Sequence, residues 1–259
     1  MSNYYTTRHR TDGFGAQFQN IIFDILYTYP NTNSNTYVFP GIDSFEHNYN
    51  NDPGYTNRLI RYMNLKDHFG GGGGGGGGGG FHLGTIHRYT ADIYSHVEDN
   101  ISKLITSEPM KLIKSLFYAD KTTPFDIRYH NVAVHVRRPN SHDCRIEGTN
   151  DTDSYYLNVI RYIRKNHDSS DGKNLRFHIY SQGDEDAYDE YMNNNDDTVL
   201  HINEDVLLTF HGLVFADTLV TSASSFSYTA ALLSNGAIYY KDFWHKPADS
   251  WIVGDKLCA

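Results

Sequence analysis

Cysteine is scarce in this chain of 259 residues. The two that are present, Cys144 and Cys258, stand far apart and lack the Cys-x-x-Cys or Cys/His spacing of a zinc site. Long apolar runs are missing as well. No segment approaches the roughly 20 apolar residues that cross a bilayer, and the start of the chain lacks the apolar core of a secretory signal. These absences argue against a disulfide scaffold, a zinc site and a membrane span, and they predict a cytoplasmic protein.

Basic residues are also in deficit, since 22 Lys and Arg stand against 31 Asp and Glu and give a formal net charge of −9. A surface that binds nucleic acid usually has a basic excess, so no nucleic-acid partner is expected. The Gly-x-Ser-x-Gly, Walker and His-Glu-x-x-His motifs are absent. Asp151-Thr-Asp153 matches the Asp-x-Asp pattern of manganese-dependent sugar transfer but falls in a predicted loop. Chemistry without a metal or other cofactor is therefore favoured.

The second half of the chain alternates strand-like and helix-like segments. Apolar, β-branched runs predict strands, and apolar residues three and four positions apart predict helices between them. The predicted strands are Asn131–Val136, Leu175–Tyr180, Thr198–Ile202, Thr218–Thr221 and Gly236–Tyr240, and the predicted helices are Ser154–Lys165, Asp184–Met192, Val206–Phe215 and Phe226–Leu233. Strands separated by helices imply right-handed crossovers and a parallel sheet. Residues 125–259 are therefore expected to form a Rossmann-like α/β domain.

The first half, residues 1–124, is less regular. A glycine turn at Thr11–Gly15 precedes an amphipathic helix with apolar positions from Phe18 to Leu26. Later patterns predict a strand at Tyr37–Phe39 and helices around Leu59–Met63, from Ile93 to Ile105, and from about Pro109 to Phe117. The tail from Lys241 onward can fold back onto this half.

Eleven consecutive glycines, Gly70–Gly80, interrupt the first half. A run without side chains has maximal backbone entropy and contributes nothing to a core. It matches a dinucleotide fingerprint only in the trivial sense that any glycine tract does, and no strand-to-helix context follows it. We interpret it as a flexible or artificial loop.

The strand at Val132–Val136 ends in two arginines, Arg137 and Arg138. Arginine presents a planar fork of donors that matches phosphate oxygens, although a solvated strand end paired with carboxylates is an equally good interpretation of this motif alone. The serine-rich turn before the last predicted helix adds hydroxyls and amides at a helix N-terminus, which suit an anion. Taken alone, that turn is better explained as an ordinary cap. Two such features at strand ends of one parallel sheet favour a phosphate-bearing ligand, and Ser181-Gln182 marks a third strand end able to contact a base or ribose.

The glycine turn of the first half carries the candidate general base, Asp12. Gly13 and Gly15 would let the backbone approach a ligand closely. A capping role for Asp12 in an Asx turn is the alternative. Asp43, Glu46 and His47 form a second acidic set, equally consistent with a solvated loop.

These residues resemble a known family. His135-Val-Arg-Arg138 resembles the His-x-Arg-Arg motif of α-1,2- and α-1,6-fucosyltransferases, Phe215–Ala230 looks like their later donor-binding motif, and Gly13–Phe18 is similar to their N-terminal glycine loop. The resemblance implies a GT-B-like fold, with two Rossmann-like domains and a donor cleft between them. It also implies inverting transfer from a nucleotide sugar.

Carried over by position, the resemblance places Arg137 on the diphosphate, with Arg138 supporting it and His135 shaping the site. It places Ser181 and Gln182 near the base or ribose, and places beside the phosphates and nucleotide Ser224, Ser225, Phe226 and Ser227. Pro139-Asn140 departs from the Gly-Asp or Thr-Asp of many relatives. GDP-fucose is the donor that the motif implies.

The segment Phe45–Pro53 also resembles glycosyltransferase-like proteins of large DNA viruses and aquatic microbes. That similarity makes UDP-xylose an alternative donor and the host cytoplasm an alternative location. The sequence thus predicts a glycosyltransferase, with a glycan hydroxyl as acceptor and Asp12 and Arg137 as catalytic residues. The competing class is a non-catalytic nucleotide-sugar- or glycan-binding protein of the same fold, whereas a phosphoryl-transfer enzyme would need a phosphate loop that the sequence lacks.

Overall fold

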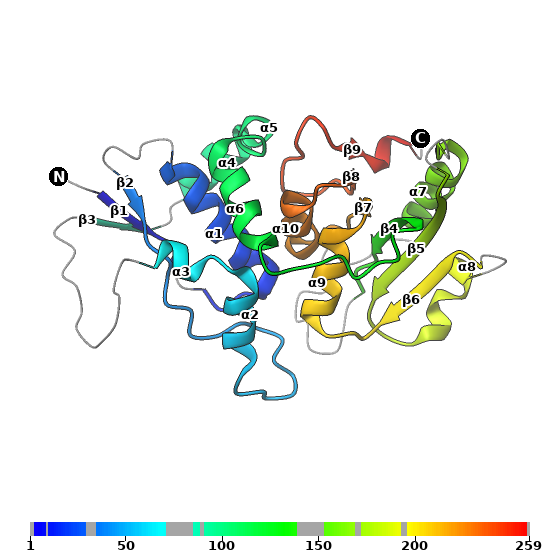
Figure 1. The fold of residues 1–259 in the computed structure, drawn as a ribbon, viewed down its shortest axis with the longest axis horizontal. Helices are drawn as coiled ribbons and strands as arrows, with labels where there is room; N and C mark the ends of the chain where they lie inside the picture. The colour runs from blue at the N-terminus through cyan, green and yellow to red at the C-terminus, as the bar shows by residue number, and fades with distance from the viewer. Residues whose placement is uncertain are drawn as a thin grey trace. The chain divides into compact units, whose positions relative to one another are not determined.

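The structure is a computed structural model that describes residues 3–8, 10–29, 35–70, 85–88, 91–138, 153–168, 172–192 and 196–257 (Figure 1). Several residues discussed above lie outside these ranges: Gly71 to Gly80 of the glycine run, Pro139, Asn140, Cys144, Asp151 and Cys258. The chain divides into two compact units, Met1–Lys121 and Thr122–Ala259. Each unit is α/β with a parallel sheet, and each is described by itself.

The C-terminal unit is built on a six-stranded sheet. Its order is β6-β5-β4-β7-β8-β9, and every neighbouring pair is parallel. The strands are β4 (Tyr129–His135), β5 (Asn174–Ser181), β6 (Thr198–Ile202), β7 (Thr218–Val220), β8 (Ala237–Tyr240) and β9 (Ile252–Val253). From β4 the chain builds outward to β6, then returns to the other side of β4 and builds outward again. This is Rossmann topology, with its switch point between β4 and β7.

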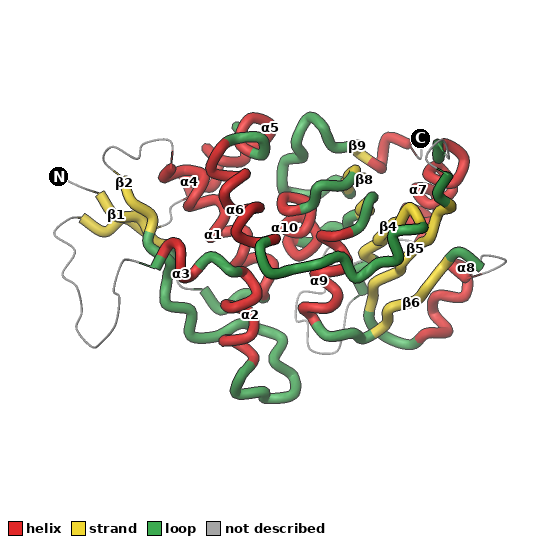
Figure 2. Tube along the Cα trace, viewed as in Figure 1, coloured by secondary structure: helices red, strands yellow, loops and turns green. Residues whose placement is uncertain are grey.

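Helices cover both faces of this sheet (Figure 2). They are α7 (Asp153–Asn166), the 3₁₀ turn η3 (Glu185–Tyr188), α8 (Asp189–Met192), α9 (Val206–Phe215), α10 (Ser225–Leu233) and the 3₁₀ turn η4 (Gly254–Leu257). Val132, Val134 and Phe177 point to one face, where they pack with buried residues of α7 in one core cluster. Tyr180 points to the other face, so close to Gly212 of α9 that a Cβ there would lie 2.1 Å from its hydroxyl. The alternation of strand residues thus fixes which helix covers which face.

Most predicted elements of this unit are confirmed. The strand Thr198–Ile202 and the helix Val206–Phe215 have the predicted bounds, while the predicted helix Asp184–Met192 is a 3₁₀ turn followed by one short α-helical turn. The described part of the tail packs within this unit. There, β9 pairs with β8, and η4 lies against α7, since a Cβ at Gly254 would be 2.6 Å from the Tyr155 hydroxyl.

The N-terminal unit has a three-stranded parallel sheet of order β2-β1-β3. The strands are β1 (Asn3–Thr6), β2 (Asn35–Tyr37) and β3 (Thr85–Arg88), and the helices are α1 (Phe14–Thr28), α2 (Tyr55–Met63), α3 (Lys66–Phe69), α4 (Ala91–Asp99), α5 (Ile101–Leu104) and α6 (Glu108–Tyr118). Helix α1 is buried along almost its whole length and packs against α4 and α6. Rings of Phe18 and Phe117 meet there at 6.2 Å between centroids. The predicted helix from Ile93 to Ile105 is interrupted at Asn100, and the predicted strand Tyr37–Phe39 lies two residues earlier in the chain.

Helix α1 carries one acidic residue, Asp24, into this core. Its side chain is buried, and its Oδ2 has no hydrogen-bond partner among the described residues. Burial raises the pKa of Asp24 to about 7, and a hydrogen bond from Thr7 opposes this shift. The folded state therefore holds a proton that the unfolded chain releases near pH 4.

We expect this proton to make stability depend on pH. Because the pKa of Asp24 is higher in the folded state, its contribution is largest at low pH and is lost as the pH rises from about 4 to about 7. The full loss is a few kcal/mol, since one pKa unit corresponds to about 1.4 kcal/mol. Urea unfolding of the wild type and Asp24→Asn at pH 5 and pH 8 measures it. The wild type should lose more stability between these pH values than the variant, and equal losses would contradict the assignment.

Candidate functional site

The carboxyl ends of β4 and β7 meet at the switch point of the C-terminal sheet. Val134 of β4 pairs with Val220 of β7, and the segment after each strand carries polar side chains. Arg137 follows β4, and its Nη1 donates to the Oγ of Ser224 at 3.4 Å. Ser224 is the N-cap of α10, with its Oγ 3.2 Å from the backbone nitrogen of Phe226. One guanidinium and one helix N-terminus therefore meet where open α/β sheets bind their ligands.

The serine turn between β7 and α10 is held by its own hydroxyls. The Oγ of Ser227 accepts from the backbone nitrogen of Ser222 at 3.1 Å. Ser227 is fully buried, so although the sequence places it beside the phosphates, here it shapes the turn that presents Ser224. The Oγ of Ser225 lies 3.1 Å from Nε2 of His245. Of the hydroxyls of Ser224, Ser225 and Ser227, only that of Ser224 accepts a hydrogen bond from Arg137 among the described residues.

His135, the last residue of β4, lies behind this turn. Its Nδ1 is 2.8 Å from the Oγ of Ser222, and its ring packs against Phe226 with 5.5 Å between centroids. Burial and, to a smaller extent, the nearby charge of Arg137 lower the pKa of His135 to about 3. The imidazole is therefore neutral at pH 7 and positions the turn without adding charge to the site.

Arg138 points to a different partner. Its Nη2 donates to the Oδ1 of Asp153 at the start of α7, and the same oxygen accepts from the Tyr191 hydroxyl at 2.6 Å. The guanidinium also lies over the Tyr188 ring, 5.5 Å from its centroid. The two arginines are thus separated in role, since Arg138 is tied to α7 and Arg137 is directed to the serine turn.

Asp153→Asn tests this separation. The substitution removes the negative charge beside Arg138, and because the pair is partly exposed we expect a stability loss of about 1 kcal/mol. Nucleotide affinity should fall far less than in Arg137→Ala, and Mn²⁺ should make no difference, because Asp153 serves as an arginine partner. Calorimetric titration of GDP with and without Mn²⁺ measures both. A Mn²⁺-dependent affinity lost in Asp153→Asn would instead identify Asp153 as a metal ligand.

Ser181 and Gln182 end the neighbouring strand β5. The Oγ of Ser181 donates to the Val136 carbonyl at 2.6 Å and lies 2.5 Å from the Tyr188 hydroxyl. Tyr188 in turn donates to the Gln182 carbonyl at 2.6 Å. Ser181 is buried and ties β5 to the segment that carries the arginines, whereas the side chain of Gln182 is exposed at the sheet edge.

The loop between β1 and α1 holds the predicted site residues of the N-terminal unit. Asp12 pairs with Nε of Arg10 at 3.0 Å and does not cap α1, whose N-cap is Gly13 with no side-chain cap bond. A Cβ at Gly13 would lie 2.9 Å from the His47 ring, so this glycine allows a close approach. Gly15 is buried inside the first turn of α1. The structure thus brings Asp12 close to Glu46 and His47. The backbone nitrogen of Glu46 donates to the Asp12 carbonyl at 3.3 Å.

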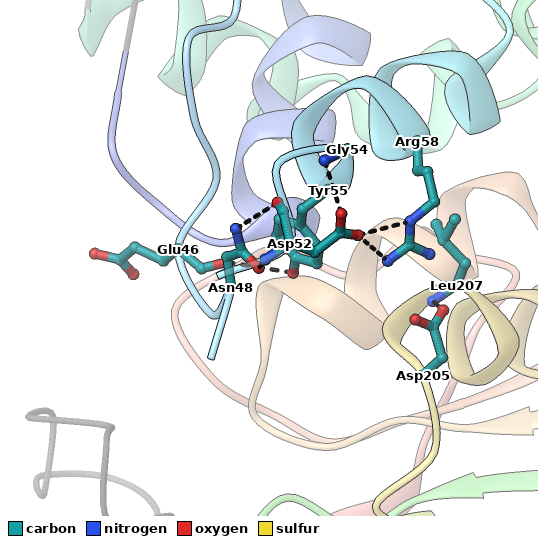
Figure 3. Close-up of polar contacts among 8 residues, drawn as sticks. All are labelled: Glu46, Asn48, Asp52, Gly54, Tyr55, Arg58, Asp205 and Leu207. Atoms are coloured by element: carbon teal, nitrogen blue, oxygen red, sulfur yellow. Dashed lines mark hydrogen bonds and ion pairs between the residues drawn. The ribbon is translucent and has the colours of Figure 1, made fainter. Parts of the chain in front are cut away.

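The segment after Glu46 is a hydrogen-bonded loop that starts α2 (Figure 3). Asn48 and Asp52 exchange two hydrogen bonds of 2.9 Å. Asp52 accepts from the backbone nitrogen of Gly54 at 2.7 Å and from two guanidinium nitrogens of Arg58. Within the segment Phe45–Pro53, Asn48 and Asp52 therefore hold the local loop structure. Figure 3 also shows the N-cap of α9, where Asp205 accepts from the nitrogen of Leu207 at 2.8 Å.

Three further residues contribute to the C-terminal site, and the sequence did not predict these roles for them. Ser222 is hydrogen-bonded to His135, Asp153 forms an ion pair with Arg138, and His245 is hydrogen-bonded to Ser225. The pairing of β4 with β7 brings His135 near Ser222, whereas Asp153 comes from the start of α7 and His245 from the segment after β8. In the described part of the chain, no group of three or more His, Cys, Asp or Glu side chains has the geometry to hold a metal ion. No helix of the described residues is long and apolar enough to span a bilayer.

Comparison with known proteins finds similarity to solved structures only. No protein-family model matches the chain, and no curated protein matches it either. Among solved structures, the chain is similar to the fucosyltransferase NodZ from Bradyrhizobium, with 12% identity over 95% of this chain and 100% of that chain and a TM-score of 0.44. The NodZ α-1,6-fucosyltransferase soaked with GDP-fucose gives 13% identity over 94% and 99% of the two chains, with a TM-score of 0.44. A mutant of Arabidopsis thaliana FUT1 in complex with GDP gives 11% identity over 97% and 72%, with a TM-score of 0.43.

Proposed function

We propose that this protein is a glycosyltransferase that moves a sugar from a nucleoside-diphosphate sugar to a hydroxyl of a glycan acceptor. The observation that carries the proposal is the contact of Arg137 with the N-cap of α10 at the switch point of a Rossmann sheet. Since the TM-scores to solved structures are below 0.5, the support comes from this chain's own residues and motifs.

The site suits a leaving diphosphate. Arg137 supplies a fixed positive charge, and the first turn of α10 supplies backbone donors and the positive end of a helix dipole. His135 stays neutral at pH 7, because burial lowers its pKa to about 3. Charge that develops on the diphosphate as the glycosidic bond breaks is stabilised without reorganisation of the site. This is a reason to expect transfer without a metal ion.

The reaction needs a base for the acceptor hydroxyl. In an inverting displacement the acceptor oxygen bonds to the anomeric carbon while the bond to the diphosphate oxygen breaks, and the hydroxyl proton passes to a carboxylate. Asp12 is our choice, since it is partly exposed on the loop that opens α1 and is held in place by Arg10. Glu46 and His47 lie beside that loop and form the second choice.

Two nucleotide sugars are candidate donors. His135-Val-Arg-Arg138 favours GDP-fucose, and UDP-xylose is the alternative. A thermal-shift screen of GDP-, UDP- and dTDP-sugars tests both, because a ligand that binds the folded state raises its melting temperature. A response to GDP-fucose supports the motif-based donor, and a response to UDP-xylose alone replaces it. Donor binding without transfer or hydrolysis would identify the non-catalytic binding protein, and no response to any nucleotide sugar would contradict the proposal.

A further inference from the structure

A hollow opens at the carboxyl edge of the N-terminal sheet. It lies at Thr7, just after β1, and where the segment after β2 passes through Pro40, Gly41 and Ile42. Its other walls are Gln17, Asn20 and Ile21 of α1 and the two arginines Arg8 and Arg10 of the β1–α1 loop. The hollow thus lies beside the carboxyl ends of the adjacent strands β1 and β2, the edge of a parallel sheet at which ligands bind.

Not every polar side chain that lines this hollow is hydrogen-bonded within the described residues. Asn20 is 3% exposed, and no hydrogen bond engages its side chain among the described residues. Its carboxamide lines the hollow and is available to a ligand there. Gln17, by contrast, already donates from its Nε2 to the carbonyls of Asp12 and Ser44. Asn20 is therefore the buried group best placed to meet a ligand.

The charge of the hollow selects the ligand. Arg10 is neutralised by Asp12 at 3.0 Å, whereas no carboxylate of the described residues pairs with Arg8. The hollow is small, about 10 Å³, which is the space of roughly one water molecule. It has room for an oxygen atom of an end group but not for a sugar ring, and a guanidinium beside a carboxamide suits an oxyanion.

We propose that this hollow binds a carboxylate or phosphate group of an acidic saccharide, with Arg8 as the charged donor and Asn20 as the buried donor. Resting on the proposed function, this names the acceptor class: a glycan that carries a uronic acid or a phosphate. Arg10 joins the hollow to Asp12 through one ion pair, so an acceptor anchored here would lie next to the candidate base.

The test uses binding and needs no turnover. The full chain carrying Arg137→Ala, which weakens the phosphate site of the C-terminal unit, is titrated calorimetrically with glucuronate, glucose 6-phosphate and glucose. We expect at least one acidic sugar to bind and glucose not to bind at the same concentration. Glucuronate alone would assign a carboxylate, glucose 6-phosphate alone a phosphate, and both the shared oxyanion chemistry.

Two added substitutions locate the binding. Arg8→Gln should weaken the acidic sugar about tenfold or more, as expected for loss of one charge-assisted hydrogen bond, and Asn20→Ala should weaken it by a smaller factor. The matched control is Arg61→Gln on the exposed side of α2, which should leave affinity unchanged. Binding of glucose equal to that of the acidic sugars, no binding of either acidic sugar, or full affinity in Arg8→Gln would overturn the proposal. Because no donor is present, these outcomes are independent of whether nucleotide sugars bind at Arg137.

Discussion

Arg137→Ala is expected to reduce sugar transfer by about 100- to 1,000-fold, as for loss of one transition-state donor. The guanidinium contacts Ser224 at the N-terminus of α10, where the leaving diphosphate would gain negative charge. The loss should fall mainly on kcat, because the interaction strengthens as that charge develops. Steady-state transfer from the best donor of the thermal-shift screen measures it.

The same substitution should leave the fold almost intact. Arg137 is half-buried at a strand end, and its described bond to Ser224 is long, at 3.4 Å, so a stability change below about 1 kcal/mol is expected. Arg161→Ala on the exposed side of α7 is the matched control and should retain transfer. Near-full turnover by Arg137→Ala would remove the basis of the proposed function.

Gly236→Ala is expected to give the largest loss of stability. A Cβ at this position would lie 2.5 Å from the carbonyl oxygens of both Ala216 and Asp217. These atoms belong to the backbone that leads into β7, so they cannot move away as a flexible side chain would. Overpacking of this kind costs about 1–3 kcal/mol and sometimes more.

The displaced segment also supports the site. Ala237 donates from its backbone nitrogen to the Asp217 carbonyl at 2.9 Å, which sets β8 against β7 and so holds the serine turn that follows β7. Donor affinity should therefore fall together with stability. Gly41→Ala is the control, because nothing lies within 4 Å of a Cβ there. Urea unfolding of both variants distinguishes them, and equal stability of Gly236→Ala and the wild type would show that this contact is not rigid.

The C-terminal sheet could be predicted because its strands are short apolar runs between clear helical patterns. Thr198–Ile202 and Val206–Phe215 are examples, and both have the predicted bounds. The N-terminal sheet was harder. The strand β1, Asn3–Thr6, contains two tyrosines between polar residues and has no alternation of apolar and polar residues. The sequence of β3, Thr85–Arg88, has one apolar residue among polar and basic ones and gives no clearer strand pattern. Their pairing depends on long-range contacts that a local pattern does not contain.

The candidate site was predictable only in outline. Arg137 and Ser224 stand at strand ends, and a parallel sheet brings such ends to one edge, so their proximity follows from the predicted topology. The different partners of Arg137 and Arg138 do not follow from the topology, because Asp153 contacts Arg138 from a helix whose position the sequence does not specify. The burial of Ser227 could not be predicted either, because the sequence of a turn does not show whether a serine in it is exposed or buried.

The most direct test of the central claim is the affinity of a nucleoside diphosphate for the C-terminal site. GDP and UDP are titrated calorimetrically into the wild type, Arg137→Ala and Arg161→Ala. We predict that one of these diphosphates binds the wild type and Arg161→Ala equally, and binds Arg137→Ala about tenfold or more weakly, because a charge-assisted contact is lost. Equal affinity for Arg137→Ala and the wild type, or no binding of either diphosphate, would contradict the claim that Arg137 and the N-terminus of α10 hold the diphosphate of a sugar donor.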